Sequence, residues 1–228
     1  MAIRAARAAL ARIFFQRCFY LFVALLLLVT VAPLIEPTPN SRLLLNLANL
    51  FVIIAAVSTL GRSMRSFIIA LVLAVPALVL QWQALASERT DMLMWSWVFA
   101  TGLYLATLTV LLRYVFQRGV MTADRLWGAA AAYLMLGVLW AYLYSLIEYF
   151  YPLSFGVGGV ATNADFPQLL YFSFTVLTST GFGDLAPLSG LARSACIQEQ
   201  IVGALFVSIL IARLAGVYPP QRRDERAH

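Results

Sequence analysis

Residues 178–184 hold the clearest chemical pattern in the sequence, Thr-Ser-Thr-Gly-Phe-Gly-Asp, in which two glycines alternate with larger residues. A ring of backbone carbonyls from extended segments can replace the hydration shell of a cation and then release the ion. Pointing successive carbonyls at one axis requires backbone angles that ordinary L-residues resist and that glycine accepts. Gly181 and Gly183 meet this requirement, so the segment is a candidate for binding a cation through its backbone.

A short apolar helix is expected directly before this segment, over residues 166–178. Asp165 can cap the free amides of its first turn, and Pro167 is favourable in that turn. The helix is too short to cross a bilayer, which takes about 20 residues, and a lone strand in lipid is not viable. We therefore expect a re-entrant helix whose C-terminal dipole faces a cation, followed by an extended return over 179–183.

The composition places these elements in a membrane. The chain of 228 residues is 62% hydrophobic and 11% charged, whereas soluble domains carry about 25% charged residues. Apolar runs long enough to span a bilayer recur along the sequence. Six crossing helices are expected, at 18–35, 43–60, 66–86, 92–112, 126–150 and 194–217.

The arginines give the orientation of these helices. All 16 basic residues are Arg; 13 fall on one set of helix ends and 3 on the other. Because cytoplasmic loops are the Arg-rich ones, both termini are expected in the cytoplasm of a plasma (inner) membrane protein. The net charge of +6 then reflects topology, and no nucleic-acid partner is expected. The outer side is net acidic, which either concentrates cations or reflects only the exclusion of arginine from that side.

The chain divides into two membrane blocks. A four-helix block is expected over 1–113, a cytoplasmic linker over 114–125, a pore domain over 126–218 and a short tail over 219–228, which is too short for a soluble regulatory domain. A voltage sensor needs several charges inside the membrane, and the first four helices contain none. Their polar residues are expected to form hydrogen bonds between helices: Asn46, Asn49, Ser58, Thr59, Gln81, Thr101, Thr107 and Thr109.

Residues 171–187, Y-F-S-F-T-V-L-T-S-T-G-F-G-D-L-A-P, resemble the pore helix and selectivity filter of potassium channels, whose filter commonly reads T-V-G-Y-G-D. The likeness covers about 165–216, and the first four helices resemble the family in number but not in charge. It implies an all-α membrane protein with six transmembrane helices, a re-entrant pore helix and an extended filter. One filter segment cannot surround an ion, so four chains must assemble as a homotetramer.

The resemblance also implies roles for single residues. Ion-binding oxygens would come from Ser179, Thr180, Gly181, Phe182 and Gly183. Two residues depart from the family pattern: Phe182 replaces a tyrosine whose hydroxyl bonds behind the filter, and Ser179 replaces a stiffer threonine. Thr175 stands where some relatives carry a Glu that pairs with the filter Asp. Tyr171 is then the better candidate partner for Asp184.

The last helix holds the other candidate residues. Glu199, an ionisable group within a membrane helix, is expected to be functional, either bonding the back of the pore helix through Ser173 or Thr175 or facing the cavity. Gly203 is either a hinge or a site of close helix packing. Arg213 is a candidate lipid-headgroup or gate contact. The cavity and a dewetting gate are expected to be lined by Ala204, Val207, Ser208, Ile211 and Ala215.

The function implied is passive, potassium-selective conduction without classical voltage gating. A weakly selective monovalent cation channel is the nearest alternative, and a cation transporter with a broken helix is a more distant one. An enzyme is not expected, because the only histidine is His228 and the sequence shows no cluster of nucleophile and base. No cofactor is expected besides the permeant potassium ions. Membrane lipids are expected partners. The sequence does not identify the stimulus that gates the pore.

Overall fold

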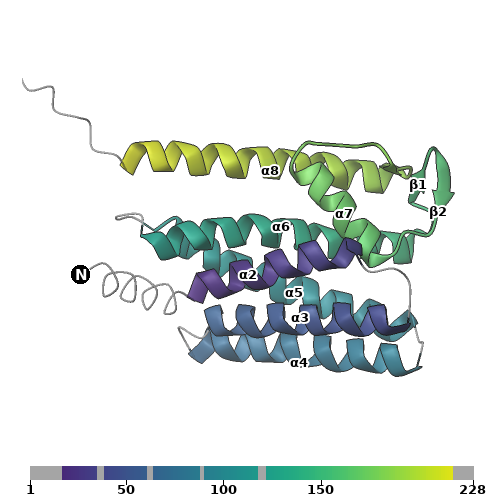
Figure 1. Ribbon diagram of the computed structural model, residues 1–228, viewed down its shortest axis with the longest axis horizontal. Helices are drawn as coiled ribbons and strands as arrows, with labels where there is room; N and C mark the ends of the chain where they lie inside the picture. Colours follow the sequence, from purple (N-terminus) through teal and green to yellow (C-terminus); the bar gives the residue numbers. More distant parts are fainter. Residues whose placement is uncertain (1–16, 35–38, 61–63, 88–89, 118–121, 218–228) are drawn as a thin grey trace, which may run out of the picture.

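The computed structural model describes residues 17–34, 39–60, 64–87, 90–117 and 122–217. The first block contains four long helices: α2 (Arg17–Val31), α3 (Pro39–Leu60), α4 (Met64–Ser87) and α5 (Thr90–Val115). The second contains α6 (Ala123–Phe150), α7 (Phe166–Leu177) and α8 (Gly190–Val217). The long helices run roughly side by side, and the short α7 is inclined to them beside α8 (Figure 1).

Four helices in the described part of the chain are long and apolar enough to cross a membrane. They are Phe67–Ala84, Thr90–Val115, Ala123–Phe150 and Gly190–Ala215. Over the described residues, Cys18–Val31 and Leu43–Thr59 are shorter apolar helices. The structure is therefore that of a mostly helical, multi-pass membrane protein, and the number of six crossings stays a prediction.

Several helix boundaries differ by three or four residues from those expected, and two of these differences have a clear local cause. The first helix was expected to reach residue 35, but α2 ends at Val31 and a 3-10 turn, η1 (Ala32–Leu34), follows. Pro33 explains this, because the residue before a proline is disfavoured in α-helical geometry. The last helix begins at Gly190, four residues before the expected 194. The Ser189 hydroxyl accepts a hydrogen bond from the Ala192 amide at 3.2 Å and so caps this earlier start.

Helix α6 lies at the centre of the fold. It contacts α2 and α5 on the side of the first block and α7 and α8 on the other. Small buried residues in α6 allow neighbouring helices to approach closely, among them Gly128, Ala129, Ala131 and Ala132. Gly137 is one such point of approach, because a methyl group there would lie 2.6 Å from the Phe174 ring of α7.

The polar residues of the first block fall into two groups. As predicted, one group bonds between helices: Asn49 donates to Gln81 at 2.9 Å, Gln81 donates to Asn46 at 2.7 Å, and the hydroxyls of Tyr104 and Tyr142 donate to Asn49. For the other group the prediction was wrong. The hydroxyls of Thr59, Thr101, Thr107 and Thr109 donate to carbonyls one turn earlier in their own helices, which satisfies them locally.

A small antiparallel sheet at one end of the molecule was not predicted. Its strands are β1 (Phe155–Val157), β2 (Val160–Thr162) and β3 (Leu185–Pro187), in the order β2-β1-β3. Gly158 and Gly159 join β1 to β2 with φ values of 58° and 82°, as a type I′ hairpin turn requires. Strand β3 directly follows the candidate cation-binding segment. Its pairing with β1 therefore fixes the backbone at the C-terminal end of that segment (Figure 1).

Candidate pore and selectivity filter

The helix before the candidate filter begins as predicted. The Asp165 side chain accepts a hydrogen bond from the Gln168 amide at 3.0 Å, and the Gln168 side chain accepts one from the Asp165 amide at 3.1 Å. This reciprocal pair is a capping box, and Pro167 occupies the first turn. Helix α7 then buries Leu169, Leu170 and Phe172 among others and ends at Leu177, with Thr178 as its C-cap.

The backbone of the candidate filter alternates in handedness. The φ angles of Ser179, Gly181 and Gly183 are 57°, 56° and 78°, in the left-handed region. Thr180 and Phe182 between them do not have positive φ. The glycines at 181 and 183 were predicted to take special angles, but the left-handed serine was not. Alternation of this kind turns successive peptide groups toward the same side, which is the geometry that a row of ion-binding carbonyls requires.

Hydrogen bonds fix which way these peptide groups face. The amides of Thr180 and Gly181 both donate to the Thr175 carbonyl, at 2.8 and 3.0 Å, and the Ser179 amide donates to the Val176 carbonyl at 2.9 Å. The amides are thus directed back into the end of α7. Within the described ranges, no hydrogen bond ends on a carbonyl oxygen of residues 179–183. These carbonyls have acceptor capacity available for a ligand.

The side chains at the outer end of the filter also meet. The rings of Tyr171 and Phe182 lie parallel, with centroids 6.3 Å apart and an interplanar angle of 5°. Burial and then the neighbouring carboxylate of Asp184 raise the pKa of the Tyr171 phenol. Tyr171, Phe182 and Asp184 therefore form one group. Thr175 contributes differently, because its hydroxyl donates to the Phe172 carbonyl at 2.8 Å and its own carbonyl holds the filter amides.

Glu199 lies behind the pore helix. Its side chain is 0% exposed, and its carboxyl oxygens contact the hydroxyls of Tyr144 and Ser173, each at 2.5 Å. Of the two alternatives considered for Glu199, the structure supports contact with the pore helix, through Ser173 and not through Thr175. Tyr144 was missed as a partner. A polar hydroxyl on an otherwise apolar helix was the available signal, but helical spacing alone does not show which neighbour it meets.

The expected cavity residues follow one stripe of α8. Ala204, Val207, Ser208, Ile211 and Ala215 recur at helical spacing, and all five are exposed in the single chain. The Ser208 hydroxyl donates to the Ala204 carbonyl at 2.8 Å, within the same helix. Gly203 lies on the opposite, buried side, where an added methyl group would lie 2.6 Å from the Leu177 carbonyl oxygen. The structure thus shows close packing at Gly203, and a hinge there stays a prediction.

The inner end of α8 is attached to the first block. The Arg213 guanidinium donates to the Phe116 carbonyl at 2.6 Å and to the Gln117 carbonyl, and it lies 5.5 Å from the centroid of the Phe116 ring. A cation at the C-terminus of a helix is favourable, because the last carbonyls lack partners within the helix. The structure places Arg213 on the end of α5, and its expected contact with a lipid headgroup or a gate stays a prediction.

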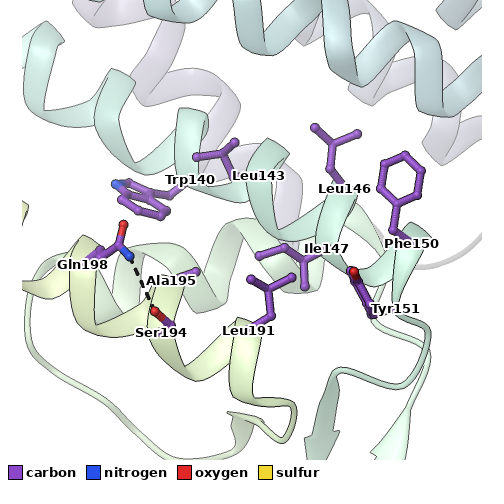
Figure 2. A pocket seen from close by; sticks show the side chains of 10 residues that line it. All are labelled: Trp140, Leu143, Leu146, Ile147, Phe150, Tyr151, Leu191, Ser194, Ala195 and Gln198. Atoms are coloured by element: carbon purple, nitrogen blue, oxygen red, sulfur yellow. Dashed lines mark hydrogen bonds between the residues drawn. The ribbon is translucent and has the colours of Figure 1, made fainter.

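A groove of about 350 Å³ lies between α6 and α8 (Figure 2). Its walls are mainly apolar side chains, including Trp140, Leu143, Ile147 and Leu191, and its polar groups are few. A surface of this composition suits contact with apolar partners and does not suit an ion path.

Comparison with known proteins supports the same region as the functional one. No curated protein and no solved structure matches the chain. Residues 129–218 match the model of a family described as ion channel. The matched range includes most of α6 and all of α7, the filter segment and α8. Residues 129–218 of this mostly helical, multi-pass membrane protein are therefore similar to ion channels.

Proposed function

We propose that the chain is the subunit of a potassium-selective channel that conducts passively through a filter built from Ser179, Thr180, Gly181, Phe182 and Gly183. The observation that carries this proposal is the alternation of left-handed φ angles at 179, 181 and 183. The amides of Ser179, Thr180 and Gly181 are bonded to carbonyls of α7, and the carbonyls of the segment are available to replace water around a cation. The aromatic and threonine-rich sequence of the segment favours potassium among monovalent cations through its resemblance to potassium-channel filters.

The proposed working unit is a homotetramer. A single chain supplies one row of carbonyls, and all residues from Thr178 to Asp184 are exposed in it. The exposed stripe of α8 lies on the same chain and would line a shared cavity below the filter. Four copies related by a cyclic axis would enclose both the filter and the cavity.

We further propose that both termini face the cytoplasm of the plasma membrane and that membrane voltage does not move the first block. The arginine distribution supports the orientation. The charged residues of α5 are Asp91 and Arg113, in its first and last turns, so its central turns carry no gating charge. This leaves the four-helix block as a packing scaffold around α6.

Recording from the purified full-length protein in planar bilayers tests the proposal. With potassium on one side and sodium on the other, we expect single-channel currents whose reversal potential shifts strongly toward that of potassium. Gly181→Ala is the matched negative control, because an alanine at a φ of 56° is strained while the rest of the chain is unchanged. A reversal potential that does not distinguish the two cations would favour the weakly selective channel. Flux without unitary currents would favour the transporter.

A further inference from the structure

The contacts around Glu199 contain more acceptors than the available hydroxyl hydrogens can satisfy. The Ser173 hydroxyl contacts two oxygens, the Gly137 carbonyl at 2.7 Å and one carboxyl oxygen of Glu199 at 2.5 Å. A hydroxyl has one hydrogen, a carbonyl oxygen only accepts, and an ionised carboxylate only accepts. The Tyr144 hydroxyl donates its hydrogen to the other carboxyl oxygen at 2.5 Å. With an ionised Glu199, the three oxygen–oxygen contacts share two hydrogens.

A neutral Glu199 supplies the missing hydrogen. The acid proton is donated to the Ser173 oxygen, the Ser173 hydrogen goes to the Gly137 carbonyl, and the Tyr144 hydrogen goes to the remaining carboxyl oxygen. Every contact then has one donor and one acceptor. Glu199, Ser173 and Tyr144 are each 0% exposed, so these side chains have no contact with bulk water. In so buried a place, a network with every member satisfied is strongly favoured.

The electrostatic surroundings favour the same state. In the described part of the chain, no arginine pairs with Glu199, and burial of an unpaired charge is costly. The titratable groups near it are Tyr133 and Tyr144 on α6 and Cys196 on α8. The only titratable group of α7, Tyr171, faces Asp184 instead. None of these neighbours carries a positive charge that would stabilise a carboxylate.

We propose that Glu199 holds a proton in the folded protein and that this proton positions the pore helix, by linking α8 to Ser173 of α7 and, through Ser173, to the Gly137 carbonyl of α6. Without this proton, the single hydrogen of the Ser173 hydroxyl can be donated either to Glu199 or to the Gly137 carbonyl, but not to both. One of the two hydrogen bonds that position the pore helix would then be lost. The proton's presence does not depend on ion selectivity. Its effect on current rests on the proposed channel function.

Infrared spectroscopy of the purified full-length protein at neutral pH tests the proton directly. The difference spectrum between wild type and Glu199→Gln is expected to show loss of the carbonyl absorption of a protonated carboxylic acid. Loss of a carboxylate absorption instead would overturn the proposal. This readout needs no current, so it separates failure of this inference from failure of the proposed function.

Two variants separate a positioning role from simple filling of space. Glu199→Gln keeps a donor and an acceptor in nearly the same shape, and its melting temperature is expected to stay near that of wild type. Glu199→Ala leaves the Tyr144 hydroxyl without this partner and Ser173 bonded only to the Gly137 carbonyl. Its melting temperature is expected to fall by at least several degrees, on the order of 5 °C. Equal losses in both variants would contradict a network that needs the proton.

Discussion

Ser179 illustrates how single residues set the shape of the filter. Its φ of 57° is a conformation that costs an L-residue about 1–2 kcal/mol, and its side chain would place a hydroxyl at the inner end of the proposed filter. The bond from its amide to the Val176 carbonyl, at 2.9 Å, holds this conformation. Strain of this kind persists where the surroundings determine the backbone, and such places are often functional.

The Tyr171 phenol is expected to stabilise the outer end of the filter through Asp184. Tyr171→Phe keeps the ring that stacks on Phe182 and removes only the hydroxyl. We expect currents that decline several-fold faster during sustained recording, with assembly unchanged. Because burial and Asp184 raise the pKa of the phenol, its contribution is complete below its ordinary value of about 10 and is lost only above that value.

The size of the Tyr171→Phe effect should therefore be the same at pH 6 and pH 9. Asp184→Asn, which removes the charge from the partner, provides the comparison and should resemble Tyr171→Phe. A Tyr171→Phe effect that disappears by pH 9 would show that the phenol titrates in this range and would contradict the assignment.

Gly203 is predicted to be a packing residue. In Gly203→Ala the new methyl group would lie 2.6 Å from the backbone oxygen of Leu177, which cannot move without disturbing the end of the pore helix. Overpacking of this kind costs about 1–3 kcal/mol, so the melting temperature should fall by about 2–10 °C. Gly190→Ala is the control, because the same methyl group there meets open space. Equal melting temperatures for the two variants would exclude close packing at Gly203.

Among the elements, the small sheet connects the outer loops to the filter. Phe155 and Val157 of β1 pair with Pro187 and Leu185 of β3, which follows the filter exit. On its other side β1 pairs with β2 through the two-glycine hairpin. The pairing of three strands fixes the position of the residues that follow the candidate filter, which a single loop would not do. The sheet is thus the proposed support of the candidate filter, whose Phe182 lacks a hydroxyl.

Gly156 is the residue on which the sheet is expected to depend. An added methyl group there would lie 2.5 Å from the Val160 carbonyl oxygen and 2.7 Å from the Leu188 side chain. Gly156→Ala should therefore loosen β3 and destabilise the conducting filter by about 1–3 kcal/mol, seen as an open probability reduced roughly tenfold. Ala161→Ser changes the exposed residue opposite Gly156 in the register and should leave the open probability unchanged. If both variants conduct like wild type, the sheet does not support the filter.

The elements that could be predicted from sequence are those with strong local signals. Neighbouring residues in the sequence are enough to predict the Asp165 cap, the length of α7 and the alternation of glycines. Long apolar runs identify α4, α5, α6 and α8. The sheet could not be predicted, because its three-residue strands are stabilised by pairing between β1 and β3 across 28 to 32 positions of the chain. Similarly, Tyr144 and Gly137 meet Glu199 and Ser173 only after three helices pack together.

For the molecule as a whole, the exposed apolar surfaces of the single chain show where lipid or protein would have to cover it. Along α8, Ile197, Ile201, Leu205 and Ile211 are more than half exposed. Only one side of the helix, which includes Glu199, Gly203 and Phe206, is buried against the same chain. A helix apolar on nearly all sides needs lipid or protein around it. With the filter exposed on the same chain, neighbouring subunits are the proposed partners for part of this surface.

Subunit mixing tests the proposed number of chains. When wild type and the non-conducting Gly181→Ala variant are co-expressed in equal amounts, random assembly of four chains leaves roughly one sixteenth of complexes fully wild type. If each filter strand is required, potassium flux per complex should fall to about that fraction. A two-chain pore would leave roughly a quarter, and independent monomers would leave about half. Mass measurement of the purified mixture controls for unequal assembly, since both chains must be found in the same particles. Flux near one half in verified mixed complexes would contradict a shared filter, because in a shared filter one strained strand interrupts the ring of carbonyls for all four subunits.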